Sequence, residues 1–96
     1  APTVICIFAQ NNFMFKTADA FCMAENMILQ ATELGIASCI ISRGYETFDN
    51  EEGRKLMKEW EVPEGYTCQC FVILGYIDGE QPHSKPRKSG RIKVIE

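Results

Sequence analysis

The sequence predicts an α/β or α+β fold, in which a small sheet is layered with helices, and two observations indicate it. First, short runs of β-branched and apolar residues alternate with segments of helical periodicity along the 96 residues. Second, 46% of the residues are hydrophobic and 24% are charged, close to the ~25% charge of ordinary globular domains, so the chain has the apolar content to fold around a core and is not disordered. A chain of this length forms one domain at most.

The first two predicted elements are a strand and a long helix. Thr3–Gln10 (TVICIFAQ) is a continuous apolar run, typical of a strand that is buried on both faces. Residues 19–34 predict a helix, with Thr17 as its expected cap and Gly35 at its C-terminal end. This helix is apolar around nearly its whole circumference, so it must be covered on nearly all sides. A three-stranded sheet cannot cover it, which indicates that further protein packs against it.

The remaining elements follow in the order strand, helix, strand. Residues 36–41 (IASCII) predict the second strand. Asp49 or Asn50 is expected to cap a short helix that begins with acidic residues and runs through Trp60. Residues 66–77 (YTCQCFVILGYI) predict the third strand, and residues 92–95 are a candidate edge strand in an otherwise polar tail.

The charge distribution separates an acidic body from a basic tail. The net charge is −3, so the chain as a whole is no electrostatic match for nucleic acid. Half of the ten basic residues lie within nine positions of the tail: Lys85, Arg87, Lys88, Arg91 and Lys93. A basic cluster on an acidic body favours a small anionic ligand.

The five cysteines show neither zinc-ligand nor redox-dithiol spacing. Because each lies in an apolar stretch, we expect buried free thiols in the reducing cytoplasm and no metal site. The only histidine, His83, has no visible partner for thiol catalysis, and no side chain is predicted to be catalytic. No apolar run reaches the ~18–20 residues of a membrane span, and no membrane partner is expected.

Three segments together resemble the nitroreductase family of FMN-dependent oxidoreductases. They are residues 19–41 (DAFCMAENMILQATELGIASCII), residues 51–66 (EEGRKLMKEWEVPEGY) and residues 71–88 (FVILGYIDGEQPHSKPRK). The resemblance implies a partial nitroreductase-like fold with three layers of sheet and helix around a central buried helix. Residues 1–96 are then the C-terminal part of a single FMN-binding domain, because nothing here matches the family's Arg-rich N-terminal portion. The opening Ala1, without an initiator Met, fits either Met removal or a chain that begins inside a longer protein.

The resemblance also implies which residues contact FMN. Lys85 and Arg87 match a Lys and an Arg that contact the FMN phosphate in the family, and a Lys point charge with an Arg fork suits a phosphate. The exit of the second strand passes the flavin ring in the family, with backbone N–H groups facing the N5 and O4 edge. The residues here are Cys39, Ile40, Ile41, Ser42 and Arg43, where family members often carry Pro-Ile-Glu-Gly. Arg43 would add positive charge near the flavin.

The function implied by the resemblance is electron transfer from NAD(P)H through FMN to a nitro compound, a quinone or a similar small-molecule acceptor. It implies a homodimer, or the remainder of the same protein, as the partner that completes the site. The alternative is a truncated, non-catalytic α/β binding or interaction module that has lost the flavin. The colour of the purified protein distinguishes the two, because bound flavin is yellow.

Overall fold

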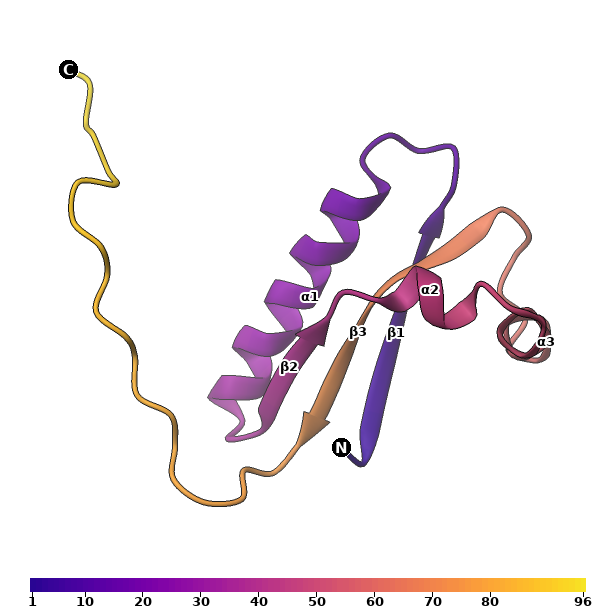
Figure 1. Ribbon diagram of the computed structural model, residues 1–96, viewed down its shortest axis with the longest axis horizontal. Helices are drawn as coiled ribbons and strands as arrows, with labels where there is room; N and C mark the ends of the chain where they lie inside the picture. Colours follow the sequence, from indigo (N-terminus) through magenta and orange to yellow (C-terminus); the bar gives the residue numbers. More distant parts are fainter.

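The computed structural model describes residues 1–96, which form one small sheet with helices on both of its faces (Figure 1). The elements in chain order are β1 (Thr3–Gln10), α1 (Lys16–Glu33), β2 (Ala37–Ile41), α2 (Gly44–Phe48), α3 (Glu51–Glu59) and β3 (Tyr66–Gly75). The tail from residue 76 has no helix or strand and is exposed throughout. None of the three helices combines the length and apolar character that crossing a lipid bilayer requires.

The last strand of the chain lies in the middle of the sheet. The strand order is β1-β3-β2, and β3 is antiparallel to both neighbours. Both faces and both edges of β3 are therefore covered, and Cys68, Cys70 and Val72 are almost completely buried. The prediction that Thr3–Gln10 is buried on both faces is wrong in this chain, because β1 is an edge strand and Ile7 is its only buried residue.

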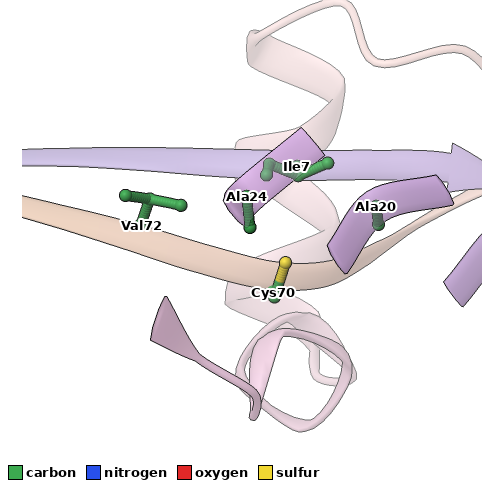
Figure 2. Close-up of a cluster of buried hydrophobic side chains, with 5 residues drawn as sticks. All are labelled: Ile7, Ala20, Ala24, Cys70 and Val72. Carbon is green, nitrogen blue, oxygen red and sulfur yellow. The ribbon is translucent and has the colours of Figure 1, made fainter. Parts of the chain in front are cut away.

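The core between the sheet and α1 is built from small side chains. Figure 2 shows Ala20 and Ala24 of α1 beside Ile7 of β1 and Cys70 and Val72 of β3. Alanine side chains allow the helix to approach the sheet closely, and Ala24 and Val72 have no exposed surface. This packing fixes α1 across all three strands.

The opposite face of the sheet is covered by α2, which packs on β3 and in turn against α3, with an aromatic cluster at the contact. The Phe48 ring lies 5.5 Å from the Phe8 ring and 6.0 Å from the Phe71 ring, measured between centroids. It also lies 5.8 Å from the Trp60 ring, beyond the end of α3. These edge-on and tilted arrangements are the ones that aromatic quadrupoles favour. With α1 on the other face, the expected three layers are present.

A β-bulge in β3 decides which side chains face α2. Ile7 is paired with Cys70, but the next residue, Phe8, is paired with Cys68, so Gln69 is an extra residue on β3. Directly opposite residues point to the same face. Cys70 therefore faces α1 with Ile7, whereas Cys68 faces α2 with Phe8.

Several predicted helix boundaries need correction. The helix expected over residues 19–34 begins at Lys16, and no side chain caps it. Thr17 lies inside the helix, where its hydroxyl donates a 3.0 Å hydrogen bond to the Gln69 Oε1, so the capping prediction is wrong. The short helix α2 was not predicted. The Asn50 cap is confirmed, because its Oδ1 accepts a 2.7 Å hydrogen bond from the Gly53 N–H.

The strand boundaries differ less from prediction. β2 begins at Ala37, one residue later than expected, and β3 ends at Gly75, two residues earlier. Residues 92–95 form no strand in this chain, where no strand edge lies beside them (Figure 1).

The side of α1 that points away from the sheet is not covered by any other part of this chain. Its buried residues are Ala20, Ala24 and Ala31, whereas Met23 and Leu29, and Leu34 just after its end, are more than half exposed. The sheet covers only one side of the helix, as expected for a helix that is apolar around nearly its whole circumference.

The burial of the five cysteines differs from the prediction. All five are free, and Cys68 and Cys70 are buried as expected, but Cys22 and Cys39 are exposed.

Candidate functional site

The predicted flavin-edge residues lie along the exit of β2. Cys39, Ile40 and Ile41 pair with Ile73, Val72 and Phe71 of β3, and β2 has no partner on its other side. An edge strand presents unpaired backbone N–H and C=O groups along its free side. The strand exit therefore has backbone hydrogen-bonding groups that are free of partners within the sheet.

The turn at Ser42 and Arg43 adds two more backbone donors. Both residues are exposed, and neither backbone N–H donates a hydrogen bond within the chain. The Arg43 carbonyl, by contrast, is fully used, because it accepts hydrogen bonds from the Thr47 N–H and hydroxyl. The turn thus has the Arg43 carbonyl engaged within the chain and two N–H groups without internal partners.

The predicted phosphate ligands lie on the tail, away from the turn. Lys85 and Arg87 are both exposed, and their one mutual contact is a 3.2 Å hydrogen bond from Arg87 Nη1 to the Lys85 carbonyl. The start of the tail lies beside the body, where Ile77, Gln81 and Pro82 line a hollow with the start of β2, and Figure 1 shows the rest of the tail running clear of the body, beyond α1. The single chain therefore brings residues 39–43 together and Lys85 with Arg87, but does not join the two groups.

Two open hollows lie near these groups and stay separate. A hollow of about 600 Å³ is lined only by residues of the tail: Pro86, Arg87, Lys88, Ser89, Gly90, Arg91 and Ile92. Another of about 400 Å³ lies at the opposite end of β2 from the turn and touches Cys39 together with the ends of β1 and β3. The basic hollow suits an anion, and the second is a groove at the end of the sheet.

The cysteines do not form a nucleophilic centre. Burial raises the pKa of Cys6, Cys68 and Cys70, and for Cys68 the raised value is about 12. A thiol attacks only as the thiolate, so these three groups are unreactive at neutral pH. They pack the sheet instead.

Two features of this region were not found from the sequence. Gly44 is buried against β3, and Thr47 holds the Arg43 carbonyl. The contact of Gly44 depends on a strand more than twenty residues further along the chain, so no local pattern reveals it. Thr47 lies four residues after Arg43, which is the spacing of a hydroxyl that bonds back to a carbonyl in a helix, and the pattern would have predicted it had α2 been recognised.

The sheet order, the helix on each face and the free edge of β2 define an α+β fold with its candidate site at a strand exit. The sequence profile of the Nitroreductase family matches residues 1–76. The chain therefore belongs to the nitroreductase family, which confirms the resemblance and the fold expected from the sequence. Lys85 and Arg87 lie beyond the matched residues.

Solved structures of nitroreductases are similar to this chain along most of its length. A nitroreductase with bound FMN from Bacteroides fragilis is 36% identical with a TM-score of 0.88, covering 100% of this chain and 52% of its own. An FMN-dependent nitroreductase from Clostridium difficile is 34% identical with a TM-score of 0.69, covering 88% and 51%. A nitroreductase with bound FMN from Desulfitobacterium hafniense is 25% identical with a TM-score of 0.80, covering 100% and 52%.

The chain thus spans about half the length of these nitroreductases. A search of curated protein sequences gave no match.

Proposed function

We propose that the protein containing this chain binds FMN and transfers electrons from NAD(P)H to a nitro compound, a quinone or a similar acceptor. The observation that carries this proposal is the 36% identity over the whole chain to a nitroreductase that was crystallised with FMN. The aligned region includes both the β2 exit and the basic tail, which are the two groups the proposal needs.

The β2 exit suits the polar edge of a flavin ring. Residues Cys39, Ile40 and Ile41 lie on a free strand edge, and Ser42 and Arg43 carry backbone N–H groups without partners. Donors aimed at the ring edge would orient it and stabilise the negative charge that reduction places there. The exposed Arg43 guanidinium would add to that effect.

The basic tail suits the phosphate of FMN. Lys85 and Arg87 make no ion pair in the chain, so both charges are available to an anion. A Lys and an Arg fork together satisfy a phosphate dianion, with each charge-assisted hydrogen bond contributing ~1.5–3 kcal/mol.

Other protein is needed to bring these two groups to one ligand. The part of the tail that carries Lys85 and Arg87 runs clear of the body, and α1 exposes Met23 and Leu29. We propose that a second subunit in a homodimer, or the remainder of the same protein, covers α1 and completes the site. The exposed residues 92–95 are proposed to add to a neighbouring sheet in that assembly. The free thiols favour a cytoplasmic location.

The chain's own residues would act by binding and orientation. Bound FMN would supply the two-electron chemistry, accepting a hydride equivalent from NAD(P)H and passing it to the acceptor. The backbone donors at residues 42–43 would hold the ring, and the tail cations would hold the phosphate. Few side chains are needed for acid–base work, which fits a sequence without a clear catalytic cluster.

The test is whether the protein of full coding length binds FMN. We expect yellow protein with flavin absorption bands, bleaching when NADH or NADPH is added and recovering when a quinone follows. Colourless protein that takes up no added FMN would favour the alternative, a non-catalytic module. Flavin that binds but is reduced by neither nucleotide would refute the assigned electron donor.

A further inference from the structure

Gly44 places the turn at residues 42–43 directly on the backbone of β3. A Cβ added at Gly44 would lie 2.8 Å from the Cys68 Sγ, 2.9 Å from the Cys70 nitrogen and 3.0 Å from the Gln69 carbonyl carbon. Two of these three atoms belong to the backbone of the central strand, where Cys70 is paired with Ile7 of β1. They cannot move aside without disturbing the sheet, so only glycine fits there.

Gly44 contacts β3 at the bulge, and hydrogen bonds of the Gln69 side chain stabilise the bulge. Gln69, the extra residue, accepts a 3.0 Å hydrogen bond from the Thr17 hydroxyl of α1. Its Nε2 donates to the Thr67 carbonyl at 3.2 Å and to the Thr67 hydroxyl at 2.9 Å. Bulges are frequent next to functional sites, where they change the direction of the chain.

A second anchor holds the turn from the α2 side. The Arg43 carbonyl accepts hydrogen bonds from the Thr47 N–H at 3.2 Å and the Thr47 hydroxyl at 2.8 Å. The Thr47 carbonyl in turn accepts a 2.8 Å hydrogen bond from Asn50 Nδ2, and Asn50 caps α3. The chain of contacts therefore runs from α3 back to the turn.

We propose that Gly44 and Thr47 are positioning residues, which hold the free N–H groups of Ser42 and Arg43 in one orientation toward the flavin edge. This inference rests on the proposed function. The pairing of Ile41 with Phe71 fixes the turn on its β2 side and the two anchors fix it on its α2 side, while its donors have no internal partners. Donors that are already ordered bind more tightly than donors that must be ordered on binding. The anchors would thus act on the flavin through the turn.

The first test is Gly44→Ala in the full-length protein. The added methyl group would push α2 off β3 and displace the donors, so we expect FMN binding to weaken by about tenfold or more, as for the loss of one net hydrogen bond. The reduction potential of bound FMN should fall, because fewer donors stabilise the reduced ring. The matched control is Gly75→Ala, where a Cβ would meet only the Pro2 ring, at 3.1 Å from its Cδ. Its affinity and potential should equal those of the wild type.

The second test keeps the proposal decidable if Gly44→Ala does not fold. Thr47→Val preserves the shape of an exposed side chain and removes the 2.8 Å hydrogen bond to the Arg43 carbonyl. We expect the potential of bound FMN to fall in this variant, whereas Thr47→Ser, which keeps the hydroxyl, restores the wild-type value.

The outcomes separate this inference from the proposed function. If the wild type binds FMN and Thr47→Val, together with Gly44→Ala where that variant folds, matches it in affinity and potential, the positioning role is refuted and the FMN proposal stands. The positioning role of Thr47 is also refuted if Thr47→Ser shifts the potential as much as Thr47→Val. If the wild type takes up no FMN, both proposals are overturned.

Discussion

Arg87→Ala isolates the proposed contribution of the tail to phosphate binding. The Arg87 side chain is exposed, and its only hydrogen bond within the chain is the 3.2 Å contact with the Lys85 carbonyl. Its removal should leave the stability of the fold unchanged, so a change in FMN affinity reports on the ligand. Losing one charge-assisted hydrogen bond costs ~1.5–3 kcal/mol, which corresponds to a dissociation constant for FMN raised ~10- to 160-fold.

The assay is a titration of FMN into the full-length apoprotein, followed by quenching of flavin fluorescence. Riboflavin, which lacks the phosphate, provides an internal reference. Arg87→Ala should weaken FMN binding and leave riboflavin binding unchanged. Lys93→Ala also removes one positive charge from the tail. It therefore controls for the long-range attraction between the tail and the phosphate, which is weakened by salt.

The reasoning would be refuted by either of two results. One is that Arg87→Ala and Lys93→Ala reduce FMN affinity equally, which would mean that the tail acts only through its net charge. The other is that Arg87→Ala weakens riboflavin as much as FMN, which would place Arg87 away from the phosphate.

Three further predictions concern the fold and its titration. Phe48→Ala should lower the free energy of unfolding by ~3–5 kcal/mol, because Phe48 is 7% exposed and carries the aromatic cluster; a loss below that of Tyr45→Ala, which truncates a half-exposed ring, would contradict it. Asn50→Ala should cost ~1 kcal/mol through the lost cap of α3, and Asn50→Ser should cost less in the same denaturant titration. The pKa of Cys68 is raised from 9.0 to about 12 in the folded state, so the unfolded thiol ionises first. Stability should therefore fall as pH rises from 9 toward 12, and a Cys68→Ala variant with the same slope would show that Cys68 is not responsible.

Much of the fold was predictable because apolar runs and turn residues are local signals. The three strands fall where those runs lie, and Asn50 was identified as a cap from its position before an acidic turn. The errors arise where distant contacts decide. β1 was expected to be covered on both faces from its composition, but β3 takes the central position. Helix α2 has five residues and too little periodicity to be detected.

The candidate site was predictable only in part for the same reason. The residues from Cys39 to Arg43 are adjacent in sequence, so their placement on one strand exit follows from the strand alone. The anchor at Gly44 arises from contact with β3, and the distance of Lys85 and Arg87 from the turn depends on the path of a tail that makes few contacts. Neither the contact of Gly44 with β3 nor the path of the tail produces a local sequence pattern.

The central claim is that the β2 exit and the tail cations meet one bound FMN once the assembly is complete. A crystal structure of the full-length protein with FMN tests it most directly. We expect the flavin ring edge within hydrogen-bonding distance of the backbone at residues 42–43, and the phosphate on Lys85 and Arg87 of the same or a second subunit. A flavin bound with its ring or its phosphate on other residues would contradict the account.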